Sequence, residues 1–461
     1  MSKFKGKRVL VVGFGISGVA AAKYLSKQGA KVMVTDTRQR NELLESIRAC
    51  EDLKIEYELG KHHEKSFQTS ELIVLSPGVP LSLKQLDFAR EANVPIVSEI
   101  ELAAQAIQEP LIAITGTNGK TTTSILMGEM FKADQKPVFV GGNVGKPLLD
   151  YVMEGPHGGH VIAELSSFQL ELQDKMVPAV AIFTNLEEDH LDRYLTMDAY
   201  IAAKKRLLKS CDRNSYVILN HDDPVVSSFA QENPGKLIWF TRKNPIKVGG
   251  EFAEKFCGAY YNQPTKQVMV KLTGREESYD LTLFKLYGDH NKENLLAAIL
   301  GARLMGVSEK AIQQVINTFR GVPHRLEFVR KKDGVFFFND SKGTNVMSVK
   351  RSLCSFPIAH SLILIAGGKD KNMDFTPLQD LVRARVKILI LLGEAKEKIN
   401  RAIGDYTETF LVGTFEEAVL LAFQKSRQTD IILLSPGCSS FDMFRNYEER
   451  GDYFKKLVSQ L

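Results

Sequence analysis

The sequence contains few cysteines, and no two of them lie close together. The five are Cys50, Cys211, Cys257, Cys354 and Cys438, and they form no C-x-x-C pair. Structural zinc sites and redox-active dithiols need that close spacing, so the sequence indicates neither. We expect reduced thiols and a cytoplasmic location.

Long apolar runs and long runs of one charge are also missing. The apolar stretch at residues 9–22 follows a basic start, as in a signal peptide, but it contains three glycines and continues into a strand–helix–strand pattern. We therefore expect it to remain as the first strand and turn. No other apolar stretch approaches the roughly 20 residues of a membrane-spanning helix. The net charge of +5 is spread along the chain, which argues against nucleic-acid and membrane partners.

What the sequence does contain is the composition and length of a multidomain enzyme. It has 461 residues, 44% of them hydrophobic and 25% charged, which predicts about three domains. Short β-branched runs alternate with helical patterns, which predicts an α/β fold with parallel sheets. We expect a Rossmann-like domain at 1–98, a central P-loop-type ATPase domain at 99–321 and a second Rossmann-like domain at 322–461. Residues 236–287 are expected to form a small antiparallel part of the central domain.

A glycine-rich turn with a lysine lies between a predicted strand and a predicted helix at "IAITGTNGKTTT", residues 112–123. Gly116 and Gly119 allow backbone N–H groups to approach phosphate oxygens, and the helix start adds partial positive charge. Lys120 would neutralise the β- and γ-phosphates, and the Thr121 hydroxyl would reach Mg²⁺. The spacing departs from the usual P-loop, because Ile114 stands where the first glycine is expected.

Carboxylates and a histidine follow two further apolar strands. Glu164 ends "HVIAE", and "NLEEDHLDR" supplies Asn185, Asp189 and His190. At the carboxyl ends of parallel strands these side chains would face the phosphate turn and form a magnesium site. The alternatives are a solvated glutamate at a strand end and an ordinary histidine on a loop.

Lys204 lies on an apolar helix face, because positions 200, 204, 207, 208 and 211 share one side of a helix. A poorly hydrated lysine favours its neutral amine. A neutral amine can react with CO₂ to form a carbamate, which is an anion able to bind Mg²⁺. The alternative is a lysine that extends its charged end to solvent.

The first strand is followed by a dinucleotide fingerprint. Gly13, Gly15 and Gly18 match G-x-G-x-x-G, and Asp36 lies about 20 residues further on. A nicotinamide- or flavin-dependent oxidoreductase is one interpretation. However, the motif only places a pyrophosphate at a helix start, and a UDP-sugar carries a pyrophosphate too.

Taken together, these motifs resemble those of the Mur ligases, the ATP-dependent amide-forming enzymes of peptidoglycan precursor synthesis. The resemblance rests on "TGTNGKTT", "GGNVGKPL", "AELSSFQLE", "TNLEEDHLDRY", "GDHNKENLLAA" and "GVPHRLE", in that order. In the third domain, "NDSKGTN", "IAGGKDKNMDF" and "LLSPGCSSFDMFRNYEERG" resemble the family member that adds D-glutamate.

The resemblance implies a role for each matched residue. The catalytic residues would be Lys120, Glu164, His190, Lys204 and Lys342. The ATP site would comprise Gly116, Thr117, Asn118, Gly119, Lys120, Thr121, Thr122, Asn291, Asn294, His324, Arg325, Asp340 and Lys342. The UDP-substrate site would comprise Ile16, Ser17, Asp36, Thr37, Arg38, Gly78, Asn143, Ser166 and Gln169. D-glutamate would contact Thr344, Lys371, Ser440, Phe441 and Tyr447. Two Mg²⁺ ions would be held by Thr121, Glu164, His190 and a carbamylated Lys204.

The implied reaction joins D-glutamate to UDP-N-acetylmuramoyl-L-alanine at the expense of ATP, through an acyl phosphate. Its product serves cell-wall biogenesis, and through it cell shape and cell division. We expect a monomer with these small molecules as its only partners. The alternatives are a sibling ligase (another Mur ligase or folylpolyglutamate synthase), a nicotinamide-dependent oxidoreductase, and a regulatory P-loop ATPase.

Overall fold

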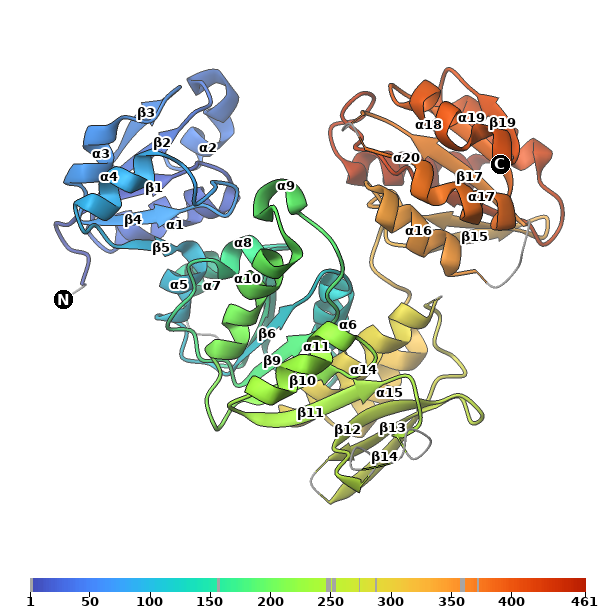
Figure 1. The fold of residues 1–461 in the computed structure, drawn as a ribbon, viewed down its shortest axis with the longest axis horizontal. Helices are drawn as coiled ribbons and strands as arrows, with labels where there is room; N and C mark the ends of the chain where they lie inside the picture. Colours follow the sequence, from blue (N-terminus) through green and yellow to red (C-terminus); the bar gives the residue numbers. More distant parts are fainter. Residues whose placement is uncertain are drawn as a thin grey trace. The chain divides into compact units, whose positions relative to one another are not determined.

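A computed structural model of the 461-residue chain describes residues 3–155, 158–245, 250, 254–272, 274–286, 288–356, 361–370 and 373–461. The chain divides into two compact units, Met1–Thr282 with Lys292–Asn317, and Leu283–Asn291 with Thr318–Leu461. Figure 1 shows one sheet in blue, a second running from cyan to yellow, and a third in orange and red. Within the described part of the chain, no helix is both long and apolar enough to cross a membrane.

The first sheet is fully parallel, with the strand order β3-β2-β1-β4-β5. Its strands are β1 (Arg8–Val12), β2 (Lys31–Asp36), β3 (Ile55–Leu59), β4 (Leu72–Leu75) and β5 (Ile96–Ser98). The helical segments are α1 (Ile16–Lys27), η1 (Arg40–Leu43), α2 (Leu44–Arg48), α3 (Glu64–Thr69), α4 (Gln85–Glu91) and α5 (Glu99–Ala104). Strand order reverses beside β1, where a ligand crevice is expected in an open sheet.

The central sheet has nine strands in the order β14-β13-β12-β11-β10-β9-β6-β8-β7. They are β6 (Leu111–Thr115), β7 (Val138–Gly142), β8 (His160–Glu164), β9 (Val180–Phe183), β10 (Tyr216–Asn220), β11 (Lys236–Thr241), β12 (Gly258–Asn262), β13 (Gln267–Leu272) and β14 (Arg275–Asp280). Every residue of β6 is buried, because helices cover both faces of a parallel sheet and leave no polar side to its strands.

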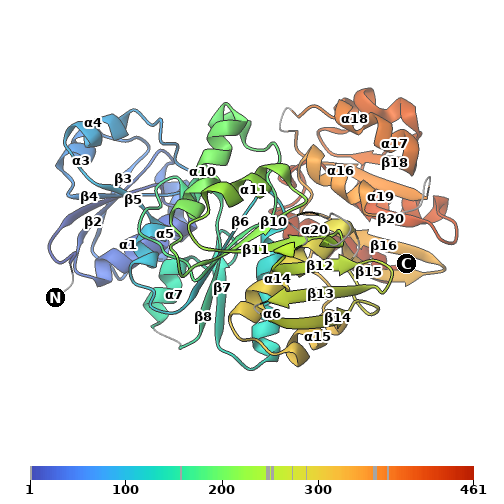
Figure 2. The ribbon, with the colours of Figure 1, turned by 60° about the horizontal axis from the view of Figure 1, so that its bottom comes forward.

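Helices cover both faces of this sheet, as Figure 2 shows for α10 and α11 on one side and α14 on the other. Tyr200 and Leu207 of α10 share a core with Ala113 of β6. On the opposite face, Met127 of α6 packs beside Ile182 at Gly301. The helical segments are α6 (Lys120–Ala133), α7 (Leu148–Glu154), α8 (Ser167–Leu170), α9 (Leu191–Tyr194), α10 (Met197–Lys209), α11 (Pro224–Ser228), η2 (Phe229–Glu232), α14 (Asp289–Leu304) and α15 (Glu309–Thr318).

The second unit contains a six-stranded sheet in the order β15-β16-β20-β17-β18-β19, parallel except for the β15–β16 pair. Its strands are β15 (Glu327–Lys332), β16 (Val335–Asn339), β17 (Leu362–Gly367), β18 (Val386–Leu392), β19 (Glu408–Leu411) and β20 (Ile431–Leu434). The helical segments are α16 (Val346–Cys354), η3 (Thr376–Leu378), α17 (Gln379–Arg385), α18 (Lys396–Ile403), η4 (Gly404–Tyr406), α19 (Phe415–Lys425) and α20 (Tyr447–Gln460).

The α/β class with three parallel-sheet domains is confirmed, but two details of the antiparallel region were wrong. β11 was expected to be antiparallel, yet it pairs parallel with both β10 and β12, and direction reverses only at β13 and β14. β11 is parallel to β10 because the chain crosses over through α11 between the two strands. The sequence could not show this, because the apolar pattern of a strand does not indicate the direction in which it runs. The last strand is the charged segment Arg275–Asp280, and the more apolar residues 281–286 after it form no strand, because an edge strand with a solvated face needs few apolar residues.

The turn between β1 and α1 is packed so closely that it requires glycine. A Cβ on Gly18 would lie 2.0 Å from the Gly13 carbonyl oxygen, and one on Gly13, at φ +87°, would lie 2.9 Å from Val79. Gly15 differs, because a Cβ there would meet nothing within 4 Å and its φ is −81°. Close packing therefore requires glycine at positions 13 and 18, whereas Gly15 leaves open space at the start of α1.

We predict that Gly18→Ala lowers the free energy of unfolding by about 1–3 kcal/mol, because its methyl group must displace backbone. The matched variant Gly15→Ala should stay within about 0.5 kcal/mol of the parent. Hydrogen exchange of peptides covering residues 8–27 during urea titration measures both. Equal protection in the two variants would contradict the packing role of Gly18.

Candidate functional site

The phosphate turn joins β6 to α6 through two glycines in conformations that side chains rarely adopt. Gly116 has φ +144°, and Gly119, which precedes the first turn of α6, has φ +84°. A Cβ on Gly119 would lie 2.0 Å from the Asn294 side-chain oxygen. The turn can therefore pass under α14 only with glycine at this position.

Hydrogen bonds from the end of β9 fasten the turn. The Thr117 N–H donates to the Asn185 carbonyl at 2.8 Å, and the Asn118 N–H donates to the Asn185 side-chain oxygen at 2.9 Å. The Thr184 hydroxyl donates to the Asn118 carbonyl at 2.6 Å. Asn185, which the sequence suggested near the metal, thus holds the turn in shape through its backbone and its side chain.

Two lysines converge on one carbonyl oxygen of this turn. Lys120 Nζ donates to the Gly116 carbonyl at 2.9 Å, and Lys204 Nζ donates to the same oxygen at 2.8 Å. Lys204 is only 1% exposed. Burial first, and the Lys120 charge second, hold the pKa of Lys204 well below its usual value, although Asp189 and Glu164 oppose the shift. The neutral amine expected from the helix pattern is therefore supported by its surroundings.

Glu164 ends β8 with a carboxylate that is only half satisfied. Its Oε1 accepts a hydrogen bond from the Asn143 amide at 2.9 Å, whereas its Oε2 is buried and lacks a hydrogen-bond partner among the described residues. A buried carboxylate oxygen without a donor is costly unless a cation lies beside it. The donor set around Glu164 therefore fits a Mg²⁺ ion, which prefers oxygen ligands.

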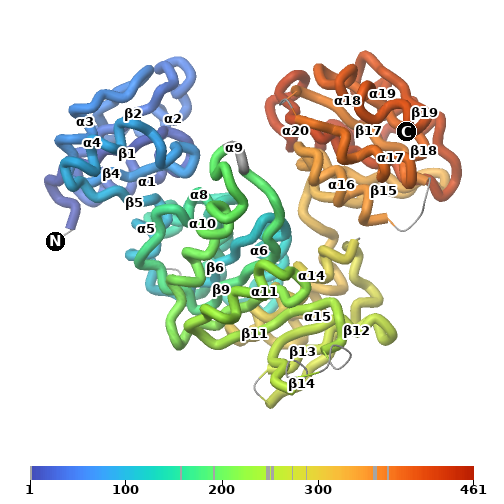
Figure 3. Tube along the Cα trace, in the orientation of Figure 1, coloured from blue at the N-terminus to red at the C-terminus, as the bar shows by residue number. Residues whose placement is uncertain are grey.

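The chain leads from β9 through α9 to α10, as Figure 3 shows. His190 directly precedes α9 in the sequence. Its ring lies 4.8 Å from that of Phe168 and 6.2 Å from that of Tyr200. Tyr200 in turn shares a hydrogen bond of 3.0 Å with the Thr117 hydroxyl. Within the described ranges, no three His, Cys, Asp or Glu side chains gather to hold a metal. The predicted set contains two residues of these types, Glu164 and His190.

A cavity of about 480 Å³ lies at the glycine fingerprint, between the first and central sheets. It is bounded by Gly13 and Gly15 on one side and by Gly142 and Pro147 on the other. Of the residues predicted to bind the UDP substrate, those that line it are Ile16, Ser17, Asp36, Arg38, Gly78, Asn143 and Gln169. Two predicted residues, Thr37 and Ser166, do not line it; Ser166 instead caps α8.

The Asp36 carboxylate in this cavity is occupied by protein groups. It accepts hydrogen bonds from the Phe14 N–H at 2.7 Å and from the Arg38 guanidinium at 2.8 and 3.1 Å. Burial raises its pKa, but the Arg38 and Phe14 hydrogen bonds outweigh burial and lower the pKa to about 2. Asp36 therefore fixes Arg38 at the cavity wall as a permanent ion pair.

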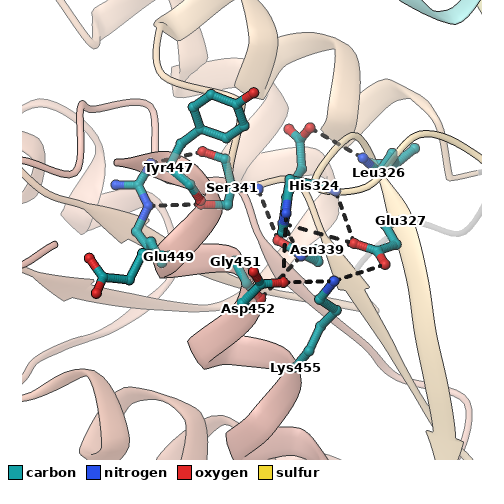
Figure 4. A network of polar contacts seen from close by, with 12 residues as sticks. His324, Leu326, Glu327, Asn339, Ser341, Tyr447, Glu449, Gly451, Asp452 and Lys455 are labelled. Carbon is teal, nitrogen blue, oxygen red and sulfur yellow. Dashed lines mark hydrogen bonds and ion pairs between the residues drawn. The ribbon is translucent and has the colours of Figure 1, made fainter. Parts of the chain in front are cut away.

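The second unit holds four of the remaining predicted nucleotide residues, His324, Arg325, Asp340 and Lys342, together with Asn291 at the start of α14, whereas Asn294 belongs to the first unit. In Figure 4, His324 lies among Asn339, Glu327 and Asp452. Its Nδ1 is 3.0 Å from the Asn339 amide, and its Nε2 is 3.7 Å from the Asp452 carboxylate. Burial and then the nearby Lys455 lower the pKa of His324, so the imidazole is neutral near pH 7.

Asp340 and Lys342 follow β16 on a buried loop. The Asp340 carboxylate accepts hydrogen bonds from Ser352 at 2.6 Å and Ser435 at 2.8 Å, and burial raises its pKa to about 6. Lys342 Nζ donates to the Tyr447 hydroxyl at 3.0 Å. Arg325 interacts electrostatically with both Asp340 and Tyr447. The structure thus brings four predicted residues close together within the second unit: Arg325, Asp340, Lys342 and Tyr447.

Sequence reasoning missed Arg450, which holds the predicted D-glutamate loops in place. Its side chain is buried and donates to the Ser341 carbonyl at 2.8 Å, the Cys438 carbonyl at 3.1 Å and the Ser439 carbonyl at 3.3 Å. The first of these loops carries Thr344 and the second carries Ser440 and Phe441. Burial lowers the pKa of Arg450 to about 10. Its position in "NYEERG" gave no signal, because most arginines on helices are exposed.

The remaining predictions are placed as follows. Thr121 and Thr122 are buried in the first turn of α6, and Asn294 packs on Gly119. Phe441 is exposed and Ser440 is buried. Lys371 lies outside the described residues.

Comparison with known families matches all three parts of the chain. Residues 7–98 match the Mur ligase MurD-like N-terminal domain, residues 114–302 the Mur ligase middle domain, and residues 324–438 the Mur ligase glutamate ligase domain. Among solved structures, a pseudomurein peptide ligase type C from Methanothermus fervidus has a TM-score of 0.60 at 20% identity, covering 99% of this chain and 100% of that one. A UDP-N-acetylmuramate-alanine ligase from Thermotoga maritima has a TM-score of 0.58 at 17% identity, covering 98% and 99%.

Curated relatives match over their whole length. Two of them, both named UDP-N-acetylmuramoylalanine–D-glutamate ligase, are the proteins of Bdellovibrio bacteriovorus, 46% identical over 99% of this chain and 98% of the relative, and of Geotalea uraniireducens, 45% identical over the same shares. Identity of this size over nearly the full length agrees with the three matched domains and with the fold. The chain belongs to the Mur ligase family.

Proposed function

We propose that this chain is the ATP-dependent ligase that adds D-glutamate to UDP-N-acetylmuramoyl-L-alanine in peptidoglycan precursor synthesis. Relatives at 41–46% identity over nearly the whole chain carry the name of this activity. A ligase that adds a different amino acid shares the fold at only 17% identity. The sibling alternatives are therefore less well supported than the D-glutamate ligase.

The observation that carries the proposal is that Asn143 belongs to both sites. It lines the cavity at the glycine fingerprint, and its amide holds the Glu164 carboxylate, which interacts electrostatically with Lys204 beside the phosphate turn. A substrate anchored at the fingerprint can therefore extend past Asn143 towards a triphosphate at Lys120. This arrangement explains why one chain carries two phosphate-binding turns.

The reaction needs both because an amine does not displace oxide from a carboxylate. Transfer of the γ-phosphoryl group to an oxygen of the alanyl carboxylate gives an acyl phosphate and ADP. The amine of D-glutamate attacks the acyl carbon, a proton is lost from nitrogen, and inorganic phosphate leaves. Every species is anionic, so the protein contributes charge compensation and positioning, chiefly through Lys120 and the backbone of residues 116–121.

Magnesium would be held by Thr121, Glu164, His190 and a carbamylated Lys204. When bound, it would neutralise charge on the phosphoryl oxygens. The neutral Lys204 amine can form a bond to the carbon of CO₂ with release of one proton, which turns a buried base into an anion. This conversion would also place an anion beside the Lys120 ammonium, with which Lys204 shares the Gly116 carbonyl.

The remaining residues would recognise the ends of the substrates. Ile16, which is 75% exposed at the start of α1, offers an apolar surface to the uracil ring, and the helix start favours the pyrophosphate. Asn291, Asn294, His324, Arg325 and Asp340 would surround the nucleoside of ATP. Thr344, Lys371, Ser440, Phe441 and Tyr447 would bind D-glutamate. The protein would act as a cytoplasmic monomer with these small molecules as its partners.

An oxidoreductase is disfavoured by the state of Asp36. In a dinucleotide site an acidic residue at this position accepts hydrogen bonds from a ribose hydroxyl. Here both of its oxygens are engaged by Arg38, and one also by the Phe14 N–H. The same ion pair provides a guanidinium for an anionic ligand.

The direct test is an assay of phosphate release with enzyme, Mg²⁺, ATP and UDP-N-acetylmuramoyl-L-alanine. We expect release only when D-glutamate is added, and not with L-glutamate, L-lysine or no amino acid. Release without any amino acid would support a regulatory ATPase, and release with L-lysine would support a sibling ligase. Either result would contradict the proposal.

For the carbamate, we predict that Lys204→Ala lowers kcat at least about a hundredfold, as expected for loss of a group that organises transition-state charge. Added bicarbonate or a short carboxylate should restore part of the activity. Lys205→Ala is the matched control, because Lys205 is the next residue of the same helix and pairs with Glu232 at the surface; it should keep full activity. A Lys204→Ala enzyme as active as the control would exclude the carbamate role.

A further inference from the structure

Arg193 of α9 connects the central part of the first unit to the turn at residues 77–79, which lines the fingerprint cavity. Its guanidinium donates to the Pro77 carbonyl at 2.9 Å and to the Val79 carbonyl at 3.2 Å. These two carbonyls flank Gly78, and the three residues form one wall of the fingerprint cavity. The side chain that fixes this wall comes from α9 in the central part of the unit.

The same guanidinium is held from the other side by Glu171, just after α8. Its Nε donates to one Glu171 oxygen at 3.1 Å, and its Nη2 donates to the other at 2.5 Å. The pair is largely buried, with 14% of the Arg193 and 10% of the Glu171 side chain exposed. A forked ion pair with this burial is a rigid connection.

Arg193 is also tied to the metal-binding segment. Its guanidinium carbon lies 4.2 Å from the centre of the Phe168 ring, and that ring lies 4.8 Å from the His190 ring. The Arg193 N–H donates to the His190 carbonyl at 3.0 Å. A displacement of Arg193 would therefore disturb the cavity wall and the surroundings of His190 together.

We propose that Arg193 is a positioning residue that sets the distance between the UDP-substrate cavity and the phosphate-transfer site, an inference that rests on the proposed function. Its planar fork serves two carbonyls, a carboxylate and an aromatic ring at once. A lysine cannot do so, because it has one nitrogen and no plane to stack. The role is geometric, since the hydrogen bonds from Arg193 to the cavity wall are accepted by backbone carbonyls.

The test compares Arg193→Lys with the parent enzyme. The KM for UDP-N-acetylmuramoyl-L-alanine should rise about tenfold, the loss expected for a hydrogen bond from a charged donor. The kcat should also fall about tenfold, because small misplacement of reacting groups is costly. The KM values for ATP and D-glutamate should stay within about twofold. Hydrogen exchange of a peptide covering residues 76–83 should become faster.

The control is Arg303→Lys, which breaks an ion pair of the same kind elsewhere in the unit. Arg303 pairs with Glu277 through two nitrogens, also donates to a backbone carbonyl, and has 13% of its side chain exposed. It lies outside the residues that line the cavity. We expect it to leave all KM values, kcat and exchange at 76–83 unchanged, whatever its effect on stability.

If Arg193→Lys does not fold, the double variant Arg193→Met with Glu171→Gln, which leaves no buried unpaired charge, replaces it.

The proposed D-glutamate ligase function and the proposed positioning role of Arg193 can fail separately. Faster exchange at 76–83 in the Arg193 variant alone supports the connection even if the enzyme uses another amino acid. Unchanged exchange and unchanged KM for the UDP substrate would overturn the positioning role. An equal rise of all three KM values would also overturn it, because it would indicate general loosening of the fold.

Discussion

The constraint on which the active site depends is the meeting of two lysine side chains at the Gly116 carbonyl. In the proposed mechanism the Lys120 ammonium compensates phosphate charge, and Lys204 is buried within hydrogen-bond reach of the same oxygen. Two ammonium groups in that position would repel each other without solvent to screen them. The lower pKa of Lys204 is how the fold accommodates this contact. A buried lysine of lowered pKa, a half-satisfied Glu164 and a glycine turn are therefore parts of a single electrostatic arrangement.

This arrangement extends to the cavity at the glycine fingerprint through side-chain contacts. Asn143 connects Glu164 to the cavity, and Tyr200 connects the phosphate turn to the His190 ring. Arg193 then connects His190 to the turn around Gly78. Each connection uses a group with fixed directions, an amide, a phenol or a guanidinium. The fingerprint cavity and the glycine turn before α6 are consequently connected by directional contacts within one compact unit.

Local patterns in the sequence predicted the features that depend on local geometry. The glycine spacings, the buried strands and the face of α10 that carries Lys204 follow from backbone sterics and helix periodicity, and the structure has them. Features that depend on distant partners could not be predicted this way. Arg450 and Arg193 act through backbone carbonyls far away in sequence, and any arginine could do so. The direction of β11 likewise depends on its connection and not on its own residues.

The family resemblance supplied the roles that geometry alone did not. Asp340 illustrates the difference: the resemblance places it in the ATP site, and in the structure its carboxylate accepts hydrogen bonds from Ser352 and Ser435. Asp36 is similar, since it lines the cavity but its oxygens are engaged by Arg38 and by the Phe14 N–H. In both places the acidic residue shapes the site through its neighbours.

The most direct test of the central claim is ¹³C NMR of the enzyme with Mg²⁺, an ATP analogue and ¹³C-bicarbonate. A neutral Lys204 amine beside Lys120 predicts one carbamate resonance in the parent enzyme. That resonance should persist in Lys205→Ala and vanish in Lys204→Ala. A parent enzyme without the resonance, or a Lys204→Ala enzyme that keeps it, would contradict the account.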